Sequence, residues 1–225
     1  MRFVTQRVRF LPINVHSDRE NVKASRHGSL FPDSIRCVIC GPSSCGKTNL
    51  LMSLLLSPSG LKFKNIYLFG KTLHQPKYQY LRRVLNHVPE IKFNVFNDST
   101  DLPQNAEPNT VCIFDDVTME DQRNIGLYYS YGRHQHLDCF YLAQNYTRIN
   151  KHLIRTNLNF LILFEQDELT LKHVYDDHIS SADLDFHEFK KMCKLCWKEP
   201  YGYLVVDKTS TDGRYRKGLD VFIKI

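Results

Sequence analysis

The chain has 225 residues, of which 42% are hydrophobic and 24% are charged, a composition typical of one globular domain and unlike that of a disordered chain. No stretch approaches the run of about 20 apolar residues that crosses a bilayer, so we expect no membrane partner. The net charge of +6 is uneven: residues 1–36 hold seven Lys or Arg against three Asp or Glu, and residues 186–225 hold nine against five. Basic flanks suit a polyanion such as nucleic acid, although a mildly basic surface gives the same totals.

The chain divides into a polar, basic entry segment and one domain. We predict an N-terminal arm over residues 1–33 and a domain over residues 34–225. The expected elements of the first half are strand 34–40, helix 47–56, strand 66–69, helix 78–87 and strand 91–96. After a polar loop, the pattern continues with strand 110–114, helix 120–131, strand 137–142, a short basic helix or turn 149–155, strand 160–164, and helices 167–176 and 183–197. Residues 202–206 and 219–225 flank a polar turn and are predicted to form a terminal β-hairpin.

Most of these strands are apolar throughout and alternate with helices. This pattern predicts an α/β fold with a mainly parallel sheet, helices on both of its faces and a C-terminal β-hairpin. The seven cysteines, an odd number without a preceding export signal, indicate free thiols in a reducing compartment.

A phosphate-binding loop follows the first predicted strand. Residues 41–48 read GPSSCGKT and match the Walker A pattern G-x-x-x-x-G-K-[ST] between a strand and a helix. Glycines at both ends let successive N–H groups point inward, and the helix that follows directs its positive end at the phosphates. The predicted nucleotide-binding residues are Gly41, Pro42, Ser43, Ser44, Cys45, Gly46, Lys47, Thr48 and Asn49.

Within this loop the residues have distinct predicted roles. Lys47 is expected to reach the β- and γ-phosphates of ATP, and Thr48 to place its hydroxyl on Mg²⁺.

Two carboxylates, Asp115 and Asp116, end a buried strand as in a Walker B motif. We expect Asp115 to hold Mg²⁺ and Asp116 to orient or deprotonate the attacking water. The usual residue in the second role is the longer Glu.

Gln144 ends the next strand and is predicted to contact the γ-phosphate or the water. Asp115 lies 68 residues after Lys47 (115 − 47), an interval that holds two more strand candidates. A strand between the phosphate-loop strand and the acidic strand is typical of motor ATPases, whereas small kinases commonly place those two strands side by side.

Several basic residues have candidate roles in catalysis or in DNA binding. Arg133 is the favoured arginine finger, with Arg155 second, because a guanidinium stabilises charge that develops on the γ-phosphate. Arg148 and Lys151 are the first candidates for DNA contacts. The C-terminal turn is the second candidate, with Arg214, Arg216 and Lys217.

Beyond these motifs, a longer series resembles one family of viral enzymes. It includes CIFDD at residues 112–116, GRH at 132–134, YLAQNY at 141–146 and the IRTNLN segment at 154–159. Over residues 28–207 the chain resembles the DNA-packaging ATPases of poxvirus-like viruses in the FtsK–HerA superfamily, most of all those of virophages and Polinton (Maverick) elements. The resemblance implies the additional-strand type of P-loop NTPase, with Lys47, Thr48, Asp115, Asp116 and Gln144 in the roles given above.

The resemblance also implies partners and a place of action. It implies an ATPase that assembles as a homo-oligomeric ring and pumps double-stranded DNA into a preformed capsid, with ATP and Mg²⁺ as cofactors and capsid proteins as partners. The expected site of action is inside the host cell, in the nucleus or in a viral factory. Within the assembling virion, the expected place is the packaging vertex. Two alternatives stay open: a P-loop nucleotide kinase, and a module that binds ATP as a switch with little hydrolysis.

Overall fold

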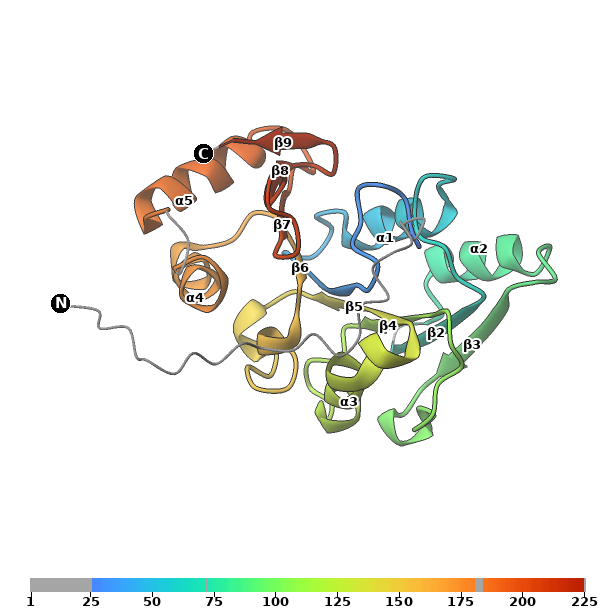
Figure 1. The fold of residues 1–225 in the computed structure, drawn as a ribbon. Helices are drawn as coiled ribbons and strands as arrows, with labels where there is room; N and C mark the ends of the chain where they lie inside the picture. Colours follow the sequence, from blue (N-terminus) through green and yellow to red (C-terminus); the bar gives the residue numbers. More distant parts are fainter. Residues whose placement is uncertain (1–25, 72, 181–183, 225) are drawn as a thin grey trace, which may run out of the picture.

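The computed structural model describes residues 26–71, 73–180 and 184–224. Strands and helices alternate along most of this part of the chain (Figure 1). The strands are β1 (Arg36–Cys40), β2 (Asn65–Gly70), β3 (Lys92–Phe96), β4 (Thr110–Asp115), β5 (Leu137–Ala143), β6 (Phe160–Leu163), β7 (Leu204–Asp207), β8 (Tyr215–Lys217) and β9 (Val221–Ile223). The α-helices are α1 (Lys47–Leu56), α2 (Pro76–Leu85), α3 (Arg123–Tyr131), α4 (Glu168–His178) and α5 (Phe186–Cys196).

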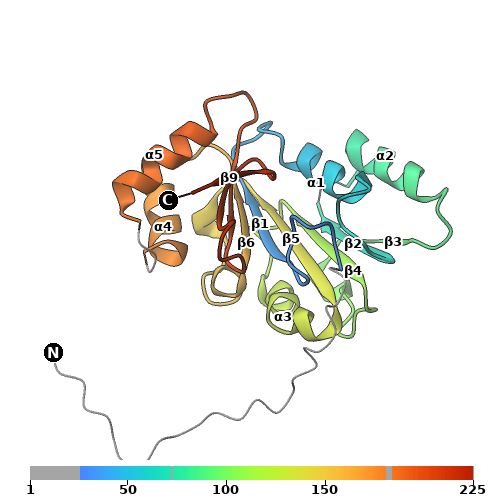
Figure 2. The same ribbon diagram turned by 45° about the horizontal axis from the view of Figure 1, so that its top comes forward.

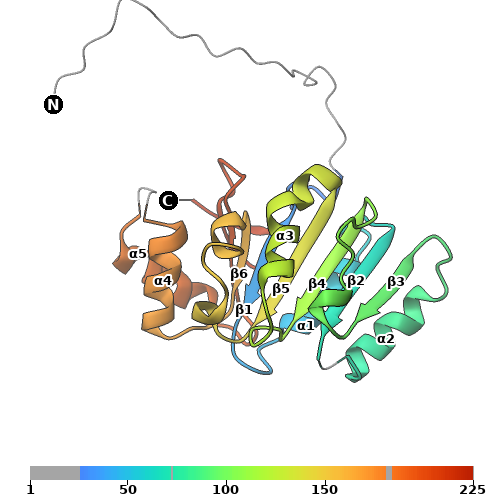
Figure 3. The same cartoon turned by 90° about the horizontal axis from the view of Figure 1, so that it is seen from below.

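All the strands join one sheet in the order β3-β2-β4-β5-β1-β6-β7-β8-β9. Figure 3 shows the parallel part of this order, from β6 across β1, β5, β4 and β2 to β3. The pairs from β3 to β6 are parallel, and β7, β8 and β9 extend the sheet in antiparallel fashion. Strand β5 separates β1 from β4, which confirms the additional-strand type of P-loop fold. The two strands between the phosphate loop and Asp115 in sequence, β2 and β3, lie beyond β4.

Helices cover both faces of the sheet, and two apolar cores result. Helices α1 and α2 pack on one face, where Leu51, Leu55 and Leu81 are buried against the strands. Helix α3 lies on the other face with α4 and α5, and Figure 1 shows α3 opposite α1 and α2. In Figure 2, β1 lies between β5 and β6, so the strand that leads into the phosphate loop is central. A central strand with both faces buried holds its carboxyl end in a fixed position.

The predicted terminal hairpin is wrong in one respect. Strand β8 lies inside the segment expected to be a polar turn, and it pairs with both β7 and β9. The two predicted strands therefore do not pair with each other. The reason is Arg216, which the sequence presents as a turn cation but which is 3% exposed and forms an ion pair with buried Asp207 at 2.6 Å. Satisfying that charge internally lets a polar segment join the sheet.

The predicted arm lies mostly outside the described residues. At its described end, Arg26 forms an ion pair with Asp138 of β5 at 3.0 Å, and Asp138 is fully buried. The division into arm and domain stays a prediction. Within the described ranges, none of the helices combines the length and the apolar character that a bilayer span requires.

Candidate active site

A cleft of about 410 Å³ lies at the carboxyl edge of the sheet, where β1, β4 and β5 end. It brings together segments that are far apart in sequence. Among its lining residues are six that the sequence predicts as site residues: Lys47, Thr48 and Asn49 at the start of α1, Asp115 and Asp116 after β4, and Gln144 after β5. The loop residues Ser43, Ser44 and Gly46 complete the predicted part of the lining.

The backbone of the phosphate loop explains why glycine stands at its two ends. A Cβ on Gly41 would lie 2.6 Å from Cβ of Phe164 and 2.7 Å from Sγ of Cys45, so only glycine fits there. Gly46 has a φ of 108°, a left-handed conformation that strains any residue with a side chain. Ser44 also has a positive φ, of 62°. The loop is anchored to the sheet because the N–H of Gly41 donates to the carbonyl oxygen of Ala143 at 3.1 Å.

This loop ends in free hydrogen-bond donors. Among the described residues, the backbone N–H groups of residues 46–49 have no acceptor, and the first turn of α1 has no acidic side chain and no side-chain cap. The ammonium of Lys47 donates to the carbonyl oxygens of Gly41 at 2.7 Å and Pro42 at 2.8 Å, which holds it over the loop. Unpaired N–H groups, a helix N-terminus and a lysine together form an anion-binding site.

Asp115 faces this loop from the end of β4. It is 8% exposed, and the Tyr78 hydroxyl donates a hydrogen bond of 2.5 Å to its Oδ2. Burial raises the pKa of Asp115, and the nearby Asp116 raises it further, while Tyr78, Lys47 and Lys77 act in the opposite direction. Burial therefore disfavours the charged form of Asp115, and the two lysines offset this effect only in part.

Asp116 and Gln144 are both exposed in the cleft. Asp116 has a φ of 54°, an uncommon conformation for a residue with a side chain. Its N–H donates to the carbonyl oxygen of Leu142 at 3.3 Å, which ties the acidic turn to β5. Because β5 lies between β1 and β4, Gln144 emerges between the phosphate loop and the acidic pair.

Four residues near this cleft were not predicted from the sequence. Gln75 lines it just before α2, and Lys77 lines it from the first turn of that helix. Tyr78 contacts Asp115, and Tyr201 lines the cleft from the turn before β7. A signal existed for the first three, since β2 neighbours β4 and its carboxyl end must open onto the same edge. The sequence offers no comparable signal for Tyr201.

The structure describes the side chain of one of the two candidate arginine fingers, Arg155. Arg133 follows α3 in the short helix Gly132–Gln135, and its side chain lies outside the described part of the structure. Arg155 is 9% exposed, forms an ion pair with Asp177 at 2.9 Å and stacks on the ring of Tyr146 at 4.9 Å. These contacts engage Arg155 within its own subunit, so we assign it a structural role.

Of the predicted DNA contacts, Arg148 is exposed, with one guanidinium nitrogen 3.4 Å from the Met119 sulfur. Lys151 is 54% exposed and forms an ion pair with Asp177 at 2.9 Å. The second candidate, the C-terminal turn, is occupied by internal contacts. Lys217 pairs with Glu199 at 2.6 Å, and Arg216 is buried on Asp207.

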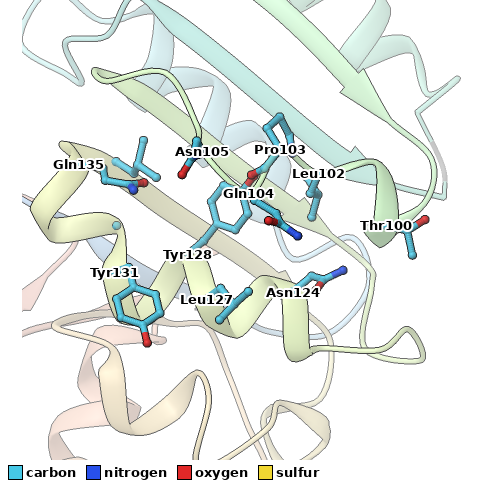
Figure 4. A pocket seen from close by; sticks show the side chains of 12 residues that line it. Thr100, Leu102, Pro103, Gln104, Asn105, Asn124, Leu127, Tyr128, Tyr131 and Gln135 are labelled. Atoms are coloured by element: carbon cyan, nitrogen blue, oxygen red, sulfur yellow. The ribbon is translucent and has the colours of Figure 1, made fainter.

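A second cavity, of about 440 Å³, lies between α3 and the loop that precedes β4 (Figure 4). Tyr128 and Leu127 of α3 face Leu102 and Pro103 of that loop. Among the described residues that line it, none carries a charge. The first cleft differs from it, because its lining includes lysines and free N–H groups, which suit an anionic ligand.

The comparison with protein families agrees with this geometry. The family model described as "Poxvirus A32 protein" matches residues 22–178, which include the phosphate loop, the acidic pair and Gln144. The chain belongs to the poxvirus A32 protein family. No curated protein shows significant sequence similarity to it.

Solved structures similar to this A32 family member include the genome packaging NTPase B204 from Sulfolobus turreted icosahedral virus 2. The AMP complex of B204 has a TM-score of 0.58 at 13% identity, covering 83% of this chain and 98% of B204. The complex with ATP-gammaS has a TM-score of 0.55 at 14% identity, covering 83% and 97%. At this identity the similarity shows a shared fold, that of P-loop packaging NTPases.

Proposed function

We propose that the protein is an ATP-hydrolysing motor that translocates double-stranded DNA into a capsid as a ring oligomer. The observation that carries the proposal is the cleft, where a phosphate loop with free N–H groups faces two carboxylates and a glutamine. Membership of the A32 family and the fold shared with B204, a genome packaging NTPase from an archaeal virus, support the packaging role.

ATP would be held by its phosphates. The free N–H groups at the start of α1 would surround the β-phosphate, and Lys47 would move from the loop carbonyls to the β- and γ-phosphates. The rest of residues 41–49 would shape this cradle. A loop already bent at Gly46 needs no rearrangement to present these donors.

The residues fit a magnesium ion. Thr48 and Asp115 offer hard oxygen donors in the same cleft, and a second carboxylate, Asp116, lies beside Asp115. When bound, Mg²⁺ would neutralise charge on the β- and γ-phosphates. The hydrogen bond from Tyr78 fixes one oxygen of Asp115 and leaves the other free as a ligand.

Hydrolysis needs a positioned water. Asp116 is exposed in the cleft one residue beyond Asp115, where its carboxylate would orient or deprotonate that water. Gln144 would contact the water or the γ-phosphate from the adjacent strand end. The β4–β5 pairing couples the two groups, so a change at the γ-phosphate would reach the loop after β5, which carries Arg148 and Lys151.

That loop is also our proposed DNA-binding region. Lys151 and Arg155 share the single carboxylate Asp177, and Lys208 and Arg214 lie close enough to lower the pKa of the adjacent His178. Lys151 is 54% exposed and competes with buried Arg155 for the same carboxylate, which leaves positive charge available for a phosphate backbone. Arg148 lies in the same loop and is exposed.

The most direct test is the ATPase rate with and without linear duplex DNA. A packaging motor predicts hydrolysis that DNA stimulates. A nucleotide kinase predicts transfer to a nucleotide acceptor and no stimulation, and a switch module predicts binding with little turnover. Either of the last two results would contradict the motor.

The ring is tested by mixing two inactive variants. Arg133→Ala should bind ATP normally but hydrolyse it about 10³-fold more slowly, because a finger contacts charge that develops only in the transition state. Lys47→Ala keeps Arg133 but cannot use its own cleft. If Arg133 acts on the neighbouring subunit, mixed rings regain part of the ATPase activity. Proven mixed assembly without recovery would contradict a role in trans.

A further inference from the structure

Tyr201 is a large side chain held open beside the phosphate loop. It is 71% exposed and lines the cleft together with Ser44 and Gly46. Its ring carbon Cδ1 lies 3.5 Å from the position that a Cβ on Gly46 would occupy. An aromatic ring is thus exposed beside the phosphate loop, on the side of Gly46.

The backbone that presents this ring is unusual. Tyr201 has a φ of 62°. This left-handed conformation is readily adopted by glycine but is sterically unfavourable for tyrosine. Among the described residues, five residues other than glycine have a positive φ. Three of them line the same cleft: Ser44, Asp116 and Tyr201. Backbone strain of this kind persists where surrounding contacts impose it, and it gathers at functional sites.

The turn that carries Tyr201 is held on both sides. Before it, Glu199 forms an ion pair with Lys217 of β8 at 2.6 Å, and the N–H of Gly202 donates to the Glu199 carbonyl oxygen at 3.0 Å. After it, the ring of Tyr203 packs on that of Phe164, with centroids 5.3 Å apart. Phe164 in turn lies against Gly41 of the phosphate loop. The backbone that carries Tyr201 is therefore held in place relative to the phosphate loop.

Strand order sets which end of a nucleotide would reach Tyr201. The acidic pair and Gln144 follow β4 and β5, on one side of β1. Tyr201 precedes β7, which lies on the other side of β1, beyond β6. A triphosphate whose γ-phosphate faces Asp115 and Asp116 extends toward the β6–β7 side, so its base comes to Tyr201.

We propose that Tyr201 is a stacking platform for the nucleobase, so that the cleft binds purine nucleoside triphosphates more tightly than pyrimidine ones. This inference rests on the proposed nucleotide binding and adds the subsite for the base. An aromatic face stacks on any base, and the larger purine ring gains more contact. The platform therefore favours ATP and GTP over CTP and UTP without separating ATP from GTP.

The test compares two triphosphate ligands, one with a nucleoside and one without. The affinities of Mg-ATP and of Mg-tripolyphosphate are measured by calorimetry on the full chain. Tyr201→Gly should weaken ATP binding about 5- to 150-fold and leave tripolyphosphate binding unchanged. Its melting temperature should not fall, because glycine accepts the left-handed backbone. Tyr201→Phe should keep both affinities. The matched control is Tyr80→Ala, which removes a 55% exposed tyrosine on α2 outside the cleft.

The outcomes separate the platform from the nucleotide site itself. Unchanged ATP affinity in Tyr201→Gly, with Lys47→Ala weakening both ligands, would overturn the platform and leave nucleotide binding intact. An equal loss for ATP and tripolyphosphate would also overturn it, since Tyr201 would then act through the phosphate loop. If the wild-type chain binds neither ligand, the proposed function fails, and the platform with it.

Discussion

Asp115 and Asp177 are two carboxylates whose pKa values shift in opposite directions in the folded protein. Asp115 is 8% exposed, and the Asp177 side chain is also 8% exposed. Burial raises the pKa of Asp115, and its neighbour Asp116 adds to the effect. Burial acts in the same direction on Asp177, but hydrogen bonds from Lys151 and Tyr146 and the charge of Arg155 outweigh it and lower its pKa.

The difference separates the proposed ATP site from a cluster whose buried charges are paired within the fold. Around Asp177, ion pairs join α4 to the loop after β5, and they stabilise the fold. At the cleft, Asp115 is buried beside Asp116, and Asp116 and Tyr201 have left-handed backbone conformations that are unfavourable for residues with side chains. Such sites trade stability for binding and catalysis. The comparison predicts that equivalent substitutions in the two regions have different consequences.

The largest effect is expected from Lys47→Ala. Removing the positive charge from the phosphates should slow ATP hydrolysis about 10²- to 10³-fold, the usual cost of one contact to transition-state charge. The free energy of unfolding should hardly change, because the ammonium donates its hydrogen bonds within the loop, to the carbonyl oxygens of Gly41 and Pro42 and to the Cys45 sulfur. Steady-state ATPase assays and urea unfolding check both points. Lys64→Ala, an exposed lysine outside the cleft, is the control, and full activity in Lys47→Ala would contradict the site.

Asp177→Asn should reverse this pattern. It leaves the Arg155 guanidinium, whose side chain is 11% exposed, without its counter-charge, and breaking a buried pair costs about 3–5 kcal/mol. Urea unfolding should show that loss, whereas the affinity for Mg-ATP should stay unchanged because Asp177 does not line the cleft. Wild-type stability in this variant would show that the cluster does not stabilise the fold.

Asp115→Asn is the matched substitution at the cleft. The raised pKa of Asp115 means that its charge is less favourable in the folded protein than in the unfolded chain. Neutralising it should therefore stabilise the protein at pH 7, by about 1 kcal/mol, while hydrolysis falls by a factor of about 10² or more. Thermal unfolding and ATPase assays measure the two effects. A destabilised Asp115→Asn variant would remove the contrast with Asp177.

The smallest expected effect is a pH dependence centred on His178. Burial lowers the pKa of His178 to about 3, with Lys208 as the next cause, and its Nε2 lies 2.7 Å from the Tyr146 hydroxyl. The folded state therefore favours the neutral ring, and stability is full above pH 6.5 and falls as the pH drops below it. From pH 7 to 6 the expected loss is less than about 1 kcal/mol. Urea unfolding at several pH values should show a shallower slope in His178→Gln, and identical slopes would contradict the assignment.

The sequence alone determined the parts that depend on local pattern. The apolar runs predicted every strand except β8, and α1 begins and ends at the predicted residues. The phosphate loop needs fixed residues at fixed spacing, and the acidic pair needs only a buried strand before it. Because neighbouring parallel strands end at one edge, these local motifs already placed Lys47, Asp115 and Gln144 in one cleft.

Tertiary structure decided what depends on contacts between distant segments. Tyr78 and Tyr201 read in the sequence as a helix residue and a turn residue, and only the packing of α2 and of the turn before β7 brings them to the cleft. Arg155 and Arg216 read as free cations until Asp177 and Asp207 pair with them. A charge is equally polar in sequence whether it faces water or a buried partner. Its partner, often far along the chain, determines whether it serves binding or stability.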